Sequence, residues 1–132
     1  MRKIISAIAS TAAALGAAAA ASAAPLPPEE RLARLLEGRV AGKPVNCINN
    51  INFTSAEIID GTAIVYRVGS KLYVNRPRSG ADSLDQDDIM VSRPFGSQLC
   101  SVDVVDLIDR GARFQTGFVM LGEFVPYTRV KR

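Results

Sequence analysis

The 132-residue chain predicts a small all-β domain, a single-domain barrel or sandwich of six to seven short antiparallel strands. Segments with alternating apolar side chains fill most of residues 45–127, and turn residues separate them roughly every eight to twelve positions. Valine and isoleucine, which favour strands, are frequent in these segments. Cys47 and Cys100 lie in the same region and predict one disulfide bond.

A signal peptide is predicted at residues 1–23. The chain starts with MRK, continues with an alanine-rich apolar run and reaches the small-x-small pattern ASA at 21–23. We place the cleavage after Ala23, because cleavage after Ala24 would leave Pro25 as the first mature residue. The alternative, an uncleaved anchor, is disfavoured because alanine is only weakly apolar. The expected location is the periplasm, with no stable membrane anchor after cleavage.

Residues 24–44 are predicted to form a proline-rich spacer and a short helix. Glu29 and Glu30 open this helix, where negative charge suits the N-terminal dipole, and it ends near Gly38. Its small apolar face carries Leu32, Leu35 and Leu36. The helix either packs on the domain or remains an appendage to it, and both alternatives stay open.

Residues 45–127 are predicted to form the β domain. Its clearest element is a hairpin of residues 62–68 and 71–75, whose first strand points Ile64, Tyr66 and Val68 to one side. Further strands are expected at 57–60, 88–93, 98–100, 118–121 and 123–125. Regular structure is expected to end at Pro126, and residues 128–132 form a tail.

Residues 101–110, SVDVVDLIDR, are ambiguous. Apolar residues at 102, 105 and 108 have helical spacing, but Val102, Val104, Val105 and Ile108 are β-branched and the neighbouring segments are strands. We predict a strand.

Charge and composition exclude several function classes. The net charge of +3 falls to +1 once Arg2 and Lys3 leave with the signal peptide, because 14 basic residues then face 13 acidic ones. Such a balance does not supply the basic surface that nucleic-acid binding needs. Histidine is absent, which removes histidine-dependent nucleophilic catalysis and most zinc sites. No cofactor and no metal site are expected.

The loop from Asn75 to Ser83 is the first candidate binding site. Arg76 and Arg78 flank a proline, and their guanidinium groups, together with the Ser79 hydroxyl, would suit a carboxylate or phosphate. The alternative is that both arginines pair with acidic residues of the same loop, which are Asp82, Asp85 and Asp88.

Other polar and aromatic clusters carry weaker signals. The acidic run at 82–88 lacks the spacing of a calcium-binding loop and predicts a solvated loop. The carboxylates at 103, 106 and 109 are poorly spaced for glycoside cleavage within one strand, and Asp103 is expected to accept backbone hydrogen bonds in a turn. Four aromatic residues are expected mainly in the core, with a contact surface as the alternative: Phe114, Phe118, Phe124 and Tyr127.

Five short motifs follow one another in a characteristic order: CI, EIIDGTAIVYR, LYVNRPRSG, LC followed by Asp103, and LGEFVPY. Together they resemble a family of small exported proteobacterial proteins without an assigned function, over roughly residues 47–127. The resemblance implies an export signal and a compact domain, and it brings no catalytic residues. It also implies a second cysteine pair, but Ser79 stands at one of these positions and the other lies near Met120. The loop at Ser79 is therefore expected to be more mobile in this protein.

The expected function is that of a non-catalytic binding or structural module of the cell envelope. Its partner would be an envelope protein or an anionic polymer, recognised by the loop that contains Arg76, Arg78 and Ser79. One alternative is an inhibitor that places this loop in the active site of a periplasmic hydrolase. A hydrolase that uses carboxylates is a further, weaker alternative.

Overall fold

The computed structural model describes residues 24–50, 53–94 and 96–131, so the predicted signal peptide lies outside the described residues. The described part contains one α-helix, one short 3₁₀ helix and ten strands. These elements are α1 (Pro28–Leu35), β1 (Arg39–Ala41), β2 (Cys47–Asn49), β3 (Phe53–Ile59), β4 (Ala63–Val68), β5 (Lys71–Asn75), η1 (Ala81–Ser83), β6 (Ile89–Ser92), β7 (Gln98–Cys100), β8 (Val104–Ile108), β9 (Gln115–Met120) and β10 (Phe124–Arg129).

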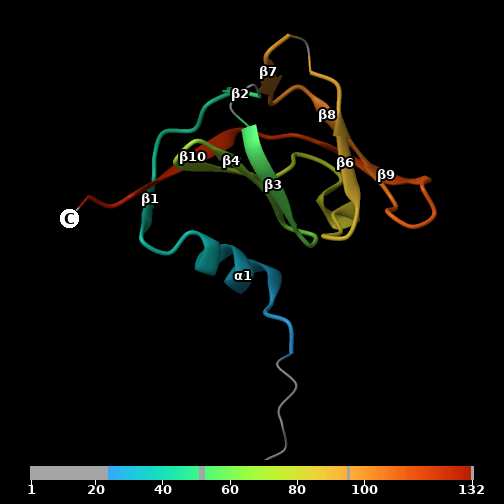
Figure 1. Ribbon diagram of the computed structural model, residues 1–132, viewed down its shortest axis with the longest axis horizontal. Helices are drawn as coiled ribbons and strands as arrows, with labels where there is room; N and C mark the ends of the chain where they lie inside the picture. The colour runs from blue at the N-terminus through green and yellow to red at the C-terminus, as the bar shows by residue number, and fades with distance from the viewer. Residues whose placement is uncertain (1–23, 51–52, 95, 132) are drawn as a thin grey trace, which may run out of the picture.

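The strands form three antiparallel sheets. The largest has the order β1-β10-β5-β4-β3, the second pairs β2 with β7, and the third has the order β6-β8-β9. Figure 1 shows α1 on one side of the largest sheet and the β6-β8-β9 sheet at the right of the molecule. None of the helices in the described part of the chain combines the length and the apolar content needed to span a bilayer.

Both faces of β4, an inner strand of the five-stranded sheet, are buried over residues 63–66, and this explains the two-sided apolar pattern of this strand. One face packs Ile64 and Tyr66 against residues from both other sheets and forms the larger core. The opposite face packs Ala63 and Val65 under α1, whose Leu32 is only 2% exposed. The molecule is therefore a layered structure of helix, sheet and second sheet, with α1 built into the domain rather than appended to it.

The all-β class and the central hairpin are confirmed. The β5 bounds match the prediction, and the expected division of side chains between the two faces of β4 is observed. The ambiguous segment 101–110 contains a strand, β8, in agreement with the prediction. Asp103 precedes this strand in a turn, and its carboxylate accepts a hydrogen bond from the Cys100 backbone N–H at 2.7 Å, as expected.

Several expectations about extent are wrong. The described residues form ten strands rather than six or seven, because short strands such as β1 and β2 carry little apolar alternation. Regular structure also continues beyond Pro126 to Arg129, because β10 pairs with β1 there. Pro126 is tolerated in this strand. Its carbonyl accepts a hydrogen bond from Gly42 N–H, which lies beyond the last residue of β1. A backbone N–H at position 126 would point to the same side, so the proline removes no hydrogen bond to a residue of β1.

The predicted disulfide is present. Cys47 and Cys100 are directly opposite each other in the β2–β7 pair, and their Cα atoms are 4.0 Å apart. The neighbouring pair, Ile48 and Leu99, is buried in the larger core. The bond therefore anchors a two-stranded ribbon that covers one end of this core.

Candidate functional site

The loop that follows β5 is fastened to the segment between β9 and β10. The buried side-chain amide of Asn75 donates a hydrogen bond to Gly122 O at 2.7 Å and accepts one from Gly122 N–H at 2.9 Å. A Cβ atom at Gly122 would lie 2.4 Å from the carbonyl oxygen of Arg76, so the two backbones can approach this closely only at glycine. Asn75 thus uses its side chain to satisfy backbone groups that have left the sheet.

Arg78 and Ser79 hold the same junction. The Arg78 backbone N–H donates to Met120 O at 2.9 Å, and Met120 N–H donates to Ser79 O at 3.0 Å. The Arg78 guanidinium donates to Leu121 O at 2.7 Å and to Ser101 O at 3.1 Å. The charged group of Arg78 is therefore bound to main-chain carbonyls and joins three segments of the fold.

Arg76 points to α1 instead. Its guanidinium forms two hydrogen bonds with the Glu29 carboxylate, at 2.8 and 3.1 Å. The bonds with Arg76 hold the pKa of Glu29 below its ordinary value, and the same bonds raise the pKa of Arg76. Both side chains remain more than half exposed.

The structure therefore corrects the alternative in which both arginines pair with aspartates of their own loop. Arg76 pairs with a helix residue 47 positions earlier, and Arg78 binds carbonyl groups. The loop brings the Arg78 and Ser79 backbone to β9, while Arg76 is directed to α1. The interactions of the loop with the rest of the domain account for both guanidinium groups.

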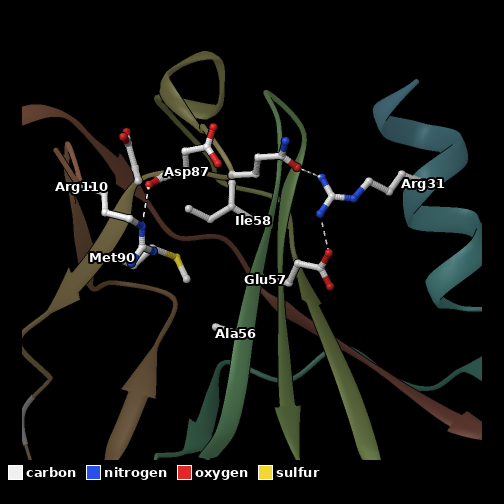
Figure 2. Close-up of a pocket in the computed structure, with 9 residues that line it drawn as sticks. Arg31, Ala56, Glu57, Ile58, Asp87, Met90 and Arg110 are labelled. Carbon is white, nitrogen blue, oxygen red and sulfur yellow. Dashed lines mark hydrogen bonds and ion pairs between the residues drawn. The ribbon is translucent and has the colours of Figure 1, made fainter. Parts of the chain in front are cut away.

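A polar groove lies between the outer strands of the two larger sheets. It has a volume of about 270 Å³ and is lined by β3 on one side and by β6 with its preceding loop on the other. Figure 2 shows Arg31 and Arg110 reaching it from opposite sides. The Arg110 Nε donates to Asp87 O at 3.3 Å, while Asp88 accepts a hydrogen bond from the Thr116 hydroxyl at 2.7 Å.

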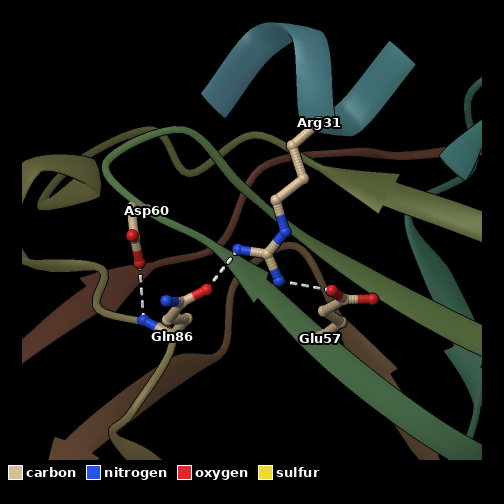
Figure 3. Close-up of polar contacts among 4 residues, drawn as sticks. All are labelled: Arg31, Glu57, Asp60 and Gln86. Atoms are coloured by element: carbon tan, nitrogen blue, oxygen red, sulfur yellow. Dashed lines mark hydrogen bonds and ion pairs between the residues drawn. The ribbon is translucent and has the colours of Figure 1, made fainter. Parts of the chain in front are cut away.

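Arg31 closes one end of this groove. Its guanidinium donates to Glu57 on β3 and to the side-chain oxygen of Gln86, as Figure 3 shows. The Gln86 backbone N–H in turn donates to the Asp60 carboxylate at 2.6 Å. These bonds connect α1, β3 and the loop before β6, so the polar lining of the groove is engaged in holding the layers together.

The outward side of the β6-β8-β9 sheet is apolar. Residues that are opposite each other in neighbouring strands share a face, and Val105 and Val119 form such a pair in the larger core. Their sequence neighbours consequently point away from the core. We call this side the outer face, and it carries Ile89, Val91, Val104, Asp106, Ile108, Gln115, Phe118 and Met120.

Two residues give the outer face its exposed apolar area. Phe118 is 53% exposed and Val104 is 42% exposed, although both belong to regular strands. The expectation that Phe118 and Phe114 lie in the core is wrong, since Phe114 is 59% exposed, whereas Phe124 is fully buried. The sequence signal that could have identified Phe118 is its position next to Val119, because two consecutive strand residues point to opposite faces and cannot both face the same core.

Asp106 lies in the middle of the outer face. Its cross-strand neighbours are Val91 and Phe118, and its carboxylate accepts a hydrogen bond from the Gln115 side chain at a long distance of 3.3 Å. Within the part of the chain that the structure describes, no lysine or arginine lies within ion-pair distance of it. Among the described residues, the outer face therefore presents a carboxylate without an ion-pair partner, next to the apolar side chains of Val91 and Phe118.

The three carboxylates at 103, 106 and 109 have separate roles. Asp103 supports the turn before β8, and Asp109 accepts a hydrogen bond from Ala112 N–H at 2.6 Å in the turn after it. Asp106 faces outward between them.

Comparison of the chain with protein-family models, curated proteins and solved structures returns no match.

Proposed function

We propose that the protein is a non-catalytic binding module of the cell envelope that binds another protein through the outer face of the β6-β8-β9 sheet. The observation that carries this proposal is the exposure of Phe118 and Val104 on a regular sheet whose other face packs Val105, Leu107 and Val119 into the larger core. Contiguous apolar area rimmed by polar residues is typical of interaction sites. Aromatic residues are also enriched among those that contribute most to binding.

The charge of Asp106 selects among the possible occupants of this face. A lipid surface would place the carboxylate in an apolar medium without a partner, at a high cost. A second copy docked face to face would bring two such carboxylates into one apolar interface. A polypeptide that presents lysine or arginine between apolar side chains would bury the apolar area and neutralise Asp106, so it is the occupant that we propose.

Two features support an envelope location. The first 23 residues have the pattern of an export signal, and the Cys47–Cys100 disulfide suits an oxidising compartment. If the protein is exported, N-terminal sequencing of material from the periplasm should start at Ala24. Recovery of the full-length chain from the cytoplasm, with reduced cysteines, would reject this part of the proposal.

The binding site is tested by selecting peptides from a random displayed library on the oxidised mature protein. We expect the selected peptides to carry lysine or arginine flanked by apolar residues, and to lose at least about tenfold in affinity for Phe118→Ser. Val40→Ser is the matched control, since Val40 is a similarly exposed residue, at 54%, on a strand of a different sheet.

The Asp106→Asn variant tests the proposed charge of the partner. It should weaken the selected peptides about tenfold at low salt and remove most of the salt dependence of their binding. Peptides that bind Phe118→Ser as well as the wild type would reject the outer face as the site. Peptides without a cation that still require Phe118 would reject the proposed partner chemistry.

A further inference from the structure

Three arginines lie on one face of the five-stranded sheet, away from the outer face and from the loop after β5. Arg39 on β1 is directly opposite Arg129 on β10. Tyr127, two residues before Arg129, is opposite Leu72, which is also opposite Arg67 of β4. Because opposite residues and residues two apart in a strand share a face, Arg39, Arg67 and Arg129 project from the same side.

The helix α1 covers the opposite end of the same sheet face. Leu72 and Tyr127 belong to the apolar cluster under the helix, whereas Arg67 and Arg129 are exposed. Arg39 is held in place because its guanidinium donates to Ser70 O at 3.0 Å and to Tyr127 O at 3.2 Å. The arginines therefore form a charged rim at the end of the sheet that the helix leaves uncovered.

The charges of this rim are not balanced by ion pairs. Within the described residues, no carboxylate lies within ion-pair distance of any of the three guanidinium groups. Glu37 lines a cavity of about 330 Å³ together with Arg129 but forms no ion pair with it. Burial lowers the pKa of Arg39, and the positive charges of Arg129 and Arg67 lower it further. Like charges on opposite residues of a sheet are destabilising, and a bound anion would relieve this repulsion.

We propose that Arg39, Arg67 and Arg129 form a binding site for a phosphate group carried by a molecule of the cell envelope. Guanidinium groups offer planar pairs of N–H donors that match phosphate oxygens. Three cations complement the double negative charge of a phosphate monoester better than the single charge of a carboxylate. This site is independent of the outer face, because it lies on a different sheet and uses charge rather than apolar contact.

The first test measures thermal unfolding of the oxidised mature protein in sodium phosphate and in sodium chloride of equal ionic strength. A ligand that binds only the folded state raises the midpoint, and we expect a rise of at least about 4 °C at a phosphate concentration tenfold above the dissociation constant. The rise should disappear in the variant that combines Arg67→Gln and Arg129→Gln. Arg39 is left intact in this variant because its bonds to carbonyl groups support the fold.

The control variant combines Arg93→Gln with Arg113→Gln. It removes the same charge from exposed positions outside the five-stranded sheet and should keep the full phosphate effect. In chloride at low ionic strength, the Arg67→Gln and Arg129→Gln variant should itself unfold at a higher temperature than the wild type, because repulsion has been removed. Equal phosphate effects in both variants, or no effect in the wild type, would overturn the proposal.

A second measurement distinguishes the sources of the phosphate. Binding to phosphatidylcholine vesicles that contain phosphatidic acid, whose headgroup is a phosphate monoester, is compared with binding to phosphatidylcholine alone, using the same two variants. Binding of inorganic phosphate without vesicle binding assigns the site to a soluble or polymeric phosphate, whereas Arg67- and Arg129-dependent binding to the anionic vesicles assigns it to a lipid headgroup. If neither phosphate binding nor vesicle binding depends on Arg67 and Arg129, the site is excluded.

Discussion

The side-chain amide of Asn75 and the backbone of Gly122 form a closed pair of hydrogen bonds, at 2.7 and 2.9 Å, inside the domain. The pair replaces a piece of sheet ladder where the chain passes from β9 to β10. Because Asn75 is fully buried, solvent does not reach the N–H and C=O groups of Gly122 from the side of this residue. This contact gives the asparagine of the LYVNRPRSG motif a structural role.

Replacing Asn75 by alanine should lower the free energy of unfolding by about 2 to 4 kcal/mol, because a buried N–H and a buried C=O lose their partners. Urea unfolding of both proteins measures the change. Asn46→Ala is the matched control, because Asn46 is exposed, and it should change stability by less than about 0.5 kcal/mol. A change of similar size in both variants would contradict the role assigned to Asn75.

The close approach at Gly122 gives a second prediction. Gly122→Ala places a Cβ atom 2.4 Å from Arg76 O, and this carbonyl belongs to backbone that cannot move independently. We expect a loss of about 3 kcal/mol or more, read from the unfolding midpoint. Gly111→Ala, whose Cβ would meet only the Asp109 side chain at 3.6 Å, should change stability by less than about 1 kcal/mol. A well-tolerated Gly122→Ala would show that the loop can move away from this junction.

The ion pair between Glu29 and Arg76 should make the attachment of α1 dependent on pH. Hydrogen bonding to Arg76 lowers the folded-state pKa of Glu29 below its ordinary value of 4.5. Its contribution to stability is therefore complete above pH 4.5 and is lost as the pH falls through the lowered folded-state pKa. Because both groups are largely exposed, we expect a coupling energy of only about 0.5 to 1 kcal/mol.

A double-mutant cycle with Glu29→Gln and Arg76→Gln measures this coupling at pH 7 and again at about pH 2.5, where it should vanish. The same cycle with Glu30→Gln in place of Glu29→Gln provides the control, since Glu30 forms no ion pair within the described structure. Coupling that persists at acidic pH would show that the two side chains interact by packing rather than by charge.

The elements with strong local signals could be predicted from the sequence. The hairpin of β4 and β5 was predictable because two segments rich in apolar residues flank the turn residues Gly69-Ser70. β8 was predictable because most of its apolar residues are β-branched. The burial of both faces of β4 was visible in its nearly continuous apolar composition. What covers each face depends on contacts between distant segments, and local pattern does not contain this information.

The candidate sites were less predictable for the same reason. The motif NRPRSG has the composition of an anion-binding loop, but the partners of Arg76 and Arg78 come from α1 and from the segment after β9. The arginine rim combines residues 39, 67 and 129, which only the pairing of β1 with β10 brings together. Phe118 was assigned to the core because aromatic residues are usually buried, whereas the register of β9 places it outside.

The Cys47–Cys100 disulfide gives the last prediction. The two cysteines are 53 positions apart, so the bond restricts a long segment of the unfolded chain. Replacing both cysteines by alanine should lower the free energy of unfolding by about 4 kcal/mol, measured by urea unfolding against the oxidised protein. The wild type unfolded under reducing conditions should lose a similar amount, and this agreement separates the effect of the bond from the change in side-chain packing. Because Ile48 and Leu99 next to the bond belong to the larger core, a loss well below this value would mean that their packing alone holds the β2–β7 ribbon in place.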